Sequence, residues 1–199
     1  MRSRKTLRPC MAACLTLLAL ALTACSGSED GSGDKPSASK GVDMHRLKAG
    51  QSITASFREA EGDITYTAVA QKVDLGTEAE AKELAAVGGS LVTDVKIKGL
   101  VPAVAHVKYT SKGGVVLNPY PDVGDIVEIY ADGRRGIQLL ERAHEEPGCV
   151  SDRDIAQWDQ GRSYVLCQTF MVPKGTKDLA VHWKPRKNGM AYVWKFKTP

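Results

Sequence analysis

The chain has 199 residues with 27 basic and 23 acidic side chains, a formal net charge of +4 at neutral pH. Four of the basic residues lie within residues 1–24, where no acidic residue occurs, so residues 25–199 carry 23 side chains of each sign. This balance excludes the broad basic surface that nucleic-acid binding requires, and we expect no nucleic-acid partner. The length beyond residue 24 suits one domain of ordinary size with a tail.

Residues 1–24 have the layout of an export signal. A basic start precedes an uncharged apolar run from Met11 to Ala24, as in a secretory signal peptide. The run is shorter than the roughly 20 residues that span a bilayer, so a permanent transmembrane helix is the weaker interpretation. We therefore predict a cleaved signal peptide over residues 1–24.

The apolar run ends in Leu22-Thr23-Ala24-Cys25, which resembles the lipobox of bacterial lipoproteins. The resemblance implies cleavage before Cys25 and acylation of that cysteine, so that the membrane is a partner through its lipid. A plain secretory signal with a chance cysteine is the alternative. We expect the mature chain to be lipid-anchored in the cell membrane, on its extracytoplasmic face.

Residues 25–46 contain almost no apolar side chains. Such a segment buries too little apolar surface to repay the entropy of ordering. We predict a flexible tether here that holds the domain about 25 Å from the lipid. The folded domain is expected over residues 47–199.

Two of the five cysteines remain after export, because Cys10 and Cys14 lie in the signal and Cys25 is expected to carry the lipid. The pair Cys149 and Cys167 is therefore predicted to form a disulfide in an oxidising compartment. Closing a loop of this size stabilises a fold by about 3 kcal/mol. A metal site is the alternative for the pair, but neither a C-x-x-C spacing nor a histidine at a ligand interval supports it.

Alternating apolar and polar residues predict β-strands along most of the domain. Two runs on either side of Glu61-Gly62-Asp63 predict a hairpin. Further strands are predicted over 91–97, 101–110, 125–131, 137–142, 164–172, 179–183 and 191–196. The rows expected to face the core are Ala103, Ala105, Val107 and Tyr109; Leu179, Val181 and Trp183; and Tyr192, Trp194 and Phe196. His106 and His182 fall on the opposite faces of their strands.

Thr77 and Glu80 form the pattern of a capping box, which predicts a short helix that Gly88 ends. Many short strands with one connecting helix are typical of an all-β protein with two packed antiparallel sheets.

Several segments carry a family resemblance: Val101–Gly113, followed by Cys149, Trp158, Cys167, Val172–Gly175 and Tyr192–Trp194. Together they resemble a group of actinobacterial lipoproteins with an immunoglobulin-like domain of unknown function, similar in type to secreted mycobacterial immunogenic antigens. The likeness covers roughly residues 50–197. It implies an immunoglobulin-like antiparallel β-sandwich and transfers no catalytic residue.

Catalytic patterns are absent from the sequence. There is no G-x-S-x-G motif, and no free cysteine is expected after export. The four histidines are His45, His106, His144 and His182, and none of them belongs to a ligand-spaced cluster. We therefore expect no enzyme, no metal and no cofactor. The alternative is a metal-binding envelope lipoprotein or a small envelope enzyme that uses scattered His and Asp residues.

The densest acidic cluster is Asp152, Asp154 and Asp159. Calcium prefers several such oxygens, but the EF-hand spacing is missing. Short acidic residues also cap turns, and we favour that interpretation over a calcium site.

Two aromatic residues and one basic patch are candidates for binding. Prolines flank Tyr120 and favour a pre-ordered, exposed contact residue, although such prolines often serve only to turn the chain. Trp158 is expected to cover the disulfide and to plug one end of the sandwich, with a ligand platform as the alternative. Lys184–Lys187 is a basic patch that could meet an anionic wall polymer or phospholipid head groups.

These features favour a non-catalytic binding or interaction module of the cell envelope, with another envelope protein or a wall polymer as its partner. The domain is too short for the two lobes of an importer's solute-binding component.

Overall fold

The computed structural model describes residues 43–60, 62–87, 97–114, 121–139, 147–186 and 189–198. The predicted signal peptide, Cys25, Tyr120, His144 and nearly all of the strand expected over 91–97 lie outside these residues. Within them, strands β1 to β10 are Met44–Lys48, Ile53–Glu59, Gly62–Leu75, Leu100–Gly113, Val127–Ala131, Arg134–Arg135, Ile137–Leu139, Ser163–Pro173, Asp178–Trp183 and Ala191–Lys197. Helix α1 is Glu78–Val87.

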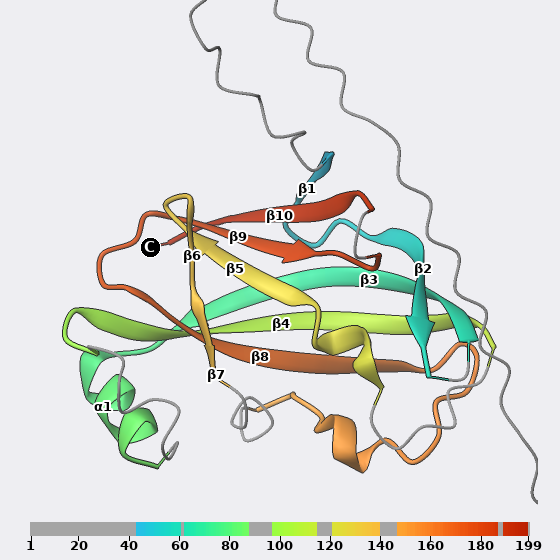
Figure 1. Cartoon of the computed structure of the whole chain (residues 1–199), viewed down its shortest axis with the longest axis horizontal. Coiled ribbons are helices and arrows are strands. Elements are labelled where there is room, and N and C mark those ends of the chain that lie inside the picture. Colours follow the sequence, from blue (N-terminus) through green and yellow to red (C-terminus); the bar gives the residue numbers. More distant parts are fainter. Residues whose placement is uncertain are drawn as a thin grey trace, which may run out of the picture. The chain divides into compact units, whose positions relative to one another are not determined.

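The strands form two five-stranded sheets that pack face to face (Figure 1). One has the order β2-β3-β4-β8-β7 and is called the β4 sheet here; the other has the order β1-β10-β9-β5-β6 and is called the β9 sheet. Both sheets contain the strand order of immunoglobulin domains, which is A-B-E-D in one sheet and C-F-G in the other. Strands A to G correspond, in this order, to β3, β4, β5, β7, β8, β9 and β10. The predicted fold class, an immunoglobulin-like β-sandwich with one short helix, is confirmed.

Two strands were not expected. β1 begins at Met44, so the sandwich takes in three residues that the sequence analysis assigned to the tether. It pairs with β10 in parallel, which also corrects the expectation of purely antiparallel sheets. β1 escaped prediction because only Leu47 is buried and the strand shows no alternation. β6 has two exposed residues and is too short to leave a pattern.

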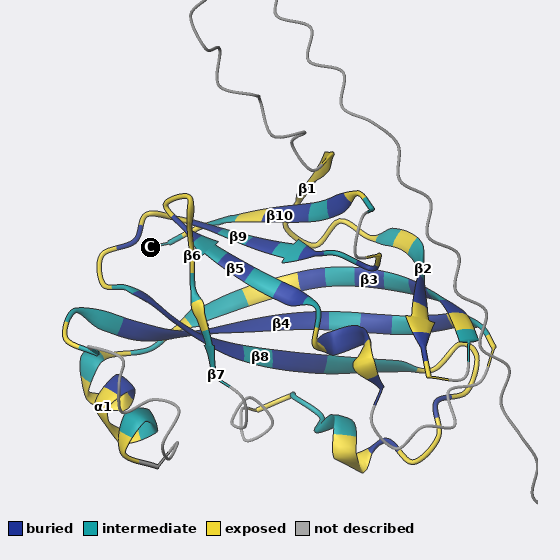
Figure 2. Cartoon of the chain, viewed as in Figure 1, coloured by how far each residue is buried: buried dark blue, intermediate teal, exposed yellow. Residues whose placement is uncertain are grey.

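The core lies between the sheets and is darkest along the central strands in Figure 2. The rows predicted on β4 and β9 are buried: Ala103, Ala105, Val107, Tyr109, Leu179, Val181 and Trp183. On β10, Trp194 is buried, whereas Tyr192 and Phe196 pack only partly against the core. β10 is next to the edge strand β1 and therefore lies near the margin of the β9 sheet, away from its centre.

Strand β3 carries a β-bulge that changes which residues face outward. Ala70 lies opposite Val107 on β4, whereas Lys72 lies opposite His106, so β3 has one extra residue between them. A bulge re-aims the side chains that follow it, because side chains alternate between the faces of a strand. Asp74, two residues after Lys72, consequently shares the outer face of the β4 sheet with His106.

Helix α1 connects β3 to β4, and its start is the predicted capping box. The Thr77 backbone N–H donates to Glu80 Oε2 at 2.6 Å, and the Glu80 backbone N–H donates to Thr77 Oγ1 at 3.3 Å. Ala81 is buried, and no other residue over 78–86 of this helix is. Within the described part of the chain, no helix is long and apolar enough to span a membrane.

Candidate functional site

Cys149 and Cys167 form the disulfide that the cysteine count predicts, with Cα atoms 5.7 Å apart. Cys167 lies on β8, and Cys149 lies in the segment that precedes this strand. The bridge therefore fastens the segment that contains Cys149 to β8, and the Val150 backbone N–H donates to the Val165 carbonyl of the same strand at 2.9 Å. His106 lies beneath the bridge and is buried, although the alternation on β4 placed it on the outward side.

Trp158 does not offer a ligand platform. Its side chain is fully buried, and its indole N–H donates to the Arg162 carbonyl at 2.9 Å. Its ring centroid lies 5.2 Å from that of Tyr66 and 5.0 Å from that of Tyr164. Trp158 is therefore part of the core at one end of the sandwich, as the favoured interpretation expects, and its buried ring does not support the alternative of a ligand platform.

Two acidic residues of the disulfide loop, Asp152 and Asp159, accept local hydrogen bonds. Ser151 caps a single turn over Asp152–Asp154, and Asp152 Oδ1 accepts from the Arg153 backbone N–H at 2.8 Å. Asp159 Oδ1 accepts from the Gln157 side chain at 2.6 Å. Among the described residues, these carboxylates do not converge into a cluster of metal ligands. The geometry supports the capping interpretation over a calcium site.

A groove of about 740 Å³ joins segments far apart in the sequence. We call it the cationic groove after its four basic residues: Arg58 of β2, Arg135 of β6, and Lys184 and Arg186 after β9. Phe57 and Val127 contribute buried apolar side chains to its wall. This volume lies within the range of known ligand sites.

Glu128 organises two of the four cations. Its Oε2 accepts from Lys184 Nζ at 2.6 Å, and its Oε1 lies 2.9 Å from Arg135 Nη2. Burial alone would raise the pKa of Glu128, but the hydrogen bond and charge of Lys184, together with the Arg135 guanidinium, lower it. Glu128 thus remains ionised and fixes both basic side chains at the groove.

Two further carboxylates line the groove. Asp63 lies 3.6 Å from the Arg58 guanidinium in a pair that is largely exposed to water. The protein around Asp125 removes part of the hydration of its carboxylate and so raises its pKa, as do the nearby charges of Asp152 and Asp122. The four cations therefore face three carboxylates, of which one has a weakened preference for the charged form.

His182 lies opposite Glu128 in the neighbouring strand and stacks on Tyr130, with ring centroids 4.2 Å apart. Burial lowers the pKa of His182 to about 4, and the Lys184 ammonium adds to this effect. The imidazole is consequently neutral at neutral pH and contributes no charge to the cationic groove. His45 lies apart from both other described histidines, on the edge strand β1.

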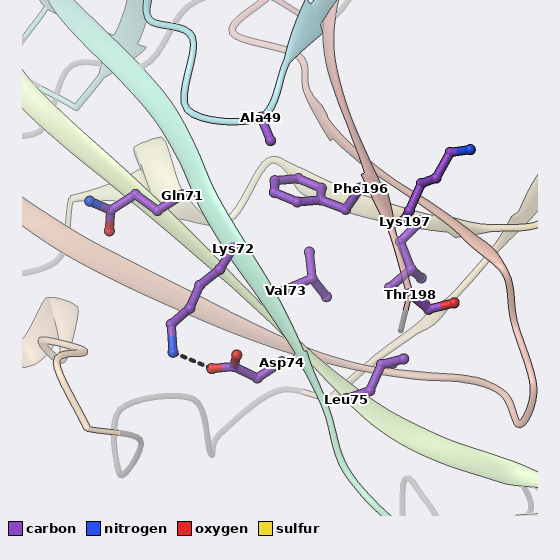
Figure 3. A pocket seen from close by; sticks show the side chains of 10 residues that line it. Ala49, Gln71, Lys72, Val73, Asp74, Leu75, Phe196, Lys197 and Thr198 are labelled. Carbon is purple, nitrogen blue, oxygen red and sulfur yellow. Dashed lines mark hydrogen bonds and ion pairs between the residues drawn. The ribbon is translucent and has the colours of Figure 1, made fainter.

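A second, smaller pocket of about 360 Å³ opens between β3 and the end of β10 (Figure 3). Val73, Leu179 and Phe196 give it an apolar lining. Lys72 and Asp74 lie at its rim and are hydrogen-bonded to each other.

The cationic groove was only partly foreseeable from the sequence. The run that begins at Lys184 indicated a basic patch, and Lys184 and Arg186 do line the groove. Arg58, Glu128 and Arg135 come from other strands and meet there only through the sheet order. No local motif marks them.

Fold and groove together define a β-sandwich of the immunoglobulin type with a charged surface groove. No family model and no curated protein matches the chain. Among solved structures, it is similar to MPT63, a secreted protein of Mycobacterium tuberculosis, with 15% identity and a TM-score of 0.48 over 77% of this chain and 98% of that one.

The chain is also similar to an uncharacterised β-sandwich protein of Clostridium difficile, at 13% identity and a TM-score of 0.43 over 80% of this chain and 98% of that one. A candidate lipoprotein of Staphylococcus aureus shows 11% identity and a TM-score of 0.41 over 73% of this chain and 93% of that one. The fold assignment rests on the strand order, and membership of the actinobacterial lipoprotein family stays a prediction.

Proposed function

We propose that this chain is a non-catalytic binding module of the cell envelope, and that its cationic groove binds an anionic wall polymer. The observation that carries the proposal is the gathering of four basic side chains, from three separate parts of the chain, along one concave surface. A flexible polyanion can follow such a groove and contact several cations at once.

The cationic groove is preorganised for an anion, because two of its basic side chains are already held in position. Glu128 holds Lys184 and Arg135 in place, so that less side-chain entropy is lost when a ligand binds. The Arg58 and Arg135 side chains are 74% and 61% exposed, which leaves their guanidinium groups accessible to a phosphate or carboxylate.

The proposed location follows from the first 25 residues. An export signal that ends in a lipobox-like sequence would place a lipid on Cys25. The segment before β1 would then connect this lipid to the sandwich and present the groove to the wall.

Sacculi that carry a phosphate-containing wall polymer provide the test, compared with sacculi from which acid has extracted that polymer. We expect the full chain to bind the first and not the second, and to bind less as ionic strength rises. Lys184→Gln/Arg186→Gln should weaken binding about thirtyfold, because each basic side chain near an anionic surface contributes about 1 kcal/mol.

Lys174→Gln/Lys197→Gln is the matched control, since it also removes two positive charges and both residues lie outside the groove. Equal binding by the two double variants would refute the groove as the site. Binding to phosphatidylglycerol vesicles with no preference for polymer-bearing sacculi would instead identify head groups as the ligand and contradict the wall-polymer proposal.

Anchoring is tested separately by Cys25→Ala. We expect the parent chain in the membrane fraction and the variant in the soluble fraction after cell disruption. A variant that stays with the membranes would contradict anchoring through Cys25 and leave the groove experiment unaffected.

A further inference from the structure

His106 lies in the middle of a row of outward-facing side chains on the β4 sheet. It is opposite Cys167 of β8 on one side and opposite Lys72 of β3 on the other. Directly opposed residues on adjacent strands are close enough for their side chains to interact. The disulfide covers this row, and His106 is only 2% exposed.

The imidazole lies between the bridge and a carboxylate. Nδ1 is 3.3 Å from the Sγ atom of Cys167 and 3.6 Å from that of Cys149. Nε2, on the other side of the ring, is 3.0 Å from Asp74 Oδ2. The carboxylate favours a proton on Nε2, which leaves the lone pair of Nδ1 directed toward the sulfur atoms.

These distances match a tetrahedral zinc site. With Zn–N of about 2.0 Å and Zn–S of about 2.3 Å, a nitrogen and a sulfur ligand on one ion are about 3.5 Å apart. Both measured nitrogen–sulfur separations lie within about 0.3 Å of that value. Only the two sulfur atoms must move apart, to about 3.8 Å, once the bond between them is gone.

We propose that reduction of the Cys149–Cys167 disulfide converts this cluster into a binding site for Zn²⁺, with Cys149, Cys167 and His106 as ligands. A dithiol supplies the two electrons and two protons that turn the disulfide into two thiols, and is itself oxidised to a disulfide. Zn²⁺ then displaces one proton from each thiol and binds two thiolates and Nδ1 of His106. The fourth position is left for water or a further ligand.

Asp74 would act as a positioning residue rather than as a ligand. A metal-bound histidine usually donates its other ring N–H to a carboxylate, which fixes the orientation of the ring. The β-bulge of β3 places Asp74 on the face where it can do this. Buried Val104 and partly buried Val165 pack around the sulfur atoms and would form the apolar shell of the site.

The movement that the site requires falls on Cys149. This residue lies outside the strands and is partly exposed, whereas Cys167 is held within β8 by pairing with β4. Cys149 also gives the ion a path from solvent to ligands that are otherwise buried.

Metal titration of the full chain tests the proposal, with a phosphine as the reductant so that no added thiol competes for the ion. Co²⁺ serves as the spectroscopic probe and Zn²⁺ as its competitor. We expect the reduced chain to bind one additional Co²⁺ compared with Cys149→Ser/Cys167→Ser, with sulfur-to-metal charge-transfer absorption, and to release it to Zn²⁺. The oxidised chain should lack this absorption.

The variant Cys149→Ser/Cys167→Ser reports any metal held by Cys10, Cys14 and Cys25, which the full chain also contains. His106→Gln should weaken binding at least tenfold and change the charge-transfer spectrum, whereas the matched variant His182→Gln should change neither. Asp74→Asn should keep the spectrum and weaken binding about tenfold.

Reduction of the disulfide could itself unfold the domain, and circular dichroism tests the proposal in that event. Spectra of the reduced chain are recorded before and after Zn²⁺ is added. Zn²⁺ should then restore the β-sheet signal, because binding to a site that forms only on folding stabilises the folded state. The proposal is overturned if the reduced chain holds no more metal than Cys149→Ser/Cys167→Ser, if His106→Gln binds as the parent does, or if an unfolded reduced chain does not recover.

Discussion

The outer face of each sheet carries a histidine, and the two residues have opposite surroundings. His106 on the β4 sheet is covered by the disulfide and lies beside a carboxylate. His182 on the β9 sheet is half-buried and lies beside the ammonium group of Lys184. In the sequence, both are polar residues in an alternating strand.

What differs is the segment that covers each strand. The disulfide fastens a neighbouring segment to β8 and covers His106 with its sulfur atoms, whereas the β9 sheet leaves a stacked ring and a charged groove at its surface. The chemistry of an outward-facing residue is therefore set by remote segments rather than by its own strand.

Removal of Trp158, the core residue between the two cysteines, should have the largest effect on stability. We expect Trp158→Ala to lower the free energy of unfolding by about 3–5 kcal/mol, because it deletes a fully buried ring. Urea unfolding followed by circular dichroism measures this change without relying on the lost fluorophore. Trp158→Phe, which keeps an aromatic ring, should lose less, and a loss below 1 kcal/mol for the alanine variant would mean that the ring is not part of the core.

Removal of the disulfide should have the second-largest effect on stability. Cys149→Ala/Cys167→Ala should cost about 3 kcal/mol, because the unfolded chain regains the freedom of the open loop. The measurement is urea unfolding under oxidising conditions. Parent protein that is reduced and kept free of metal should show a similar loss, and an unchanged midpoint for either would contradict a stabilising bridge.

On the other sheet, Glu128→Gln should lower the free energy of unfolding by about 1 kcal/mol at neutral pH. The carboxylate is partly buried and pairs with Lys184 and Arg135, so its loss leaves two cations that repel each other. Asp63→Asn is the control, because its pair with Arg58 is exposed to water and should contribute less than 0.5 kcal/mol. A larger loss for Asp63→Asn would reverse this ranking.

The last prediction concerns the loss of stability in acid. Because the pKa of His182 falls from 6.5 to about 4 on folding, the unfolded chain binds a proton between these values that the folded chain does not. The free energy of unfolding therefore decreases as the pH falls from about 6.5 toward 4. His182→Gln should show a smaller drop in thermal midpoint between pH 7 and pH 5 than the parent, whereas exposed His45→Gln should behave like the parent.

The sequence predicted the fold correctly in those segments that bury one face and expose the other. The rows on β4 and β9, the β2–β3 hairpin and the capped helix were all predicted, since local periodicity and local hydrogen bonds determine them. β1 was missed because a short edge strand with a single buried side chain has no periodicity.

The sites depended on information that no single segment contains. The bulge in β3 shifts Asp74 to the face of His106, and nothing around Gln71 in the sequence marks that shift. The cationic groove likewise depends on the order of strands in the sheet. Trp158 was given a possible surface role because its spacing between the cysteines does not reveal the depth at which its ring packs.

The parallel pairing of β1 with β10 has a mechanical consequence. Met44 aligns with Ala191 and Lys48 with Lys195, so the two strands run in the same direction side by side. A force that pulls the residues before β1 away from those after β10 acts along both strands and loads the bonds of this ladder together, in shear. The hydrogen bonds between β1 and β10 would therefore have to break together, rather than one after another, for such a force to separate the two strands.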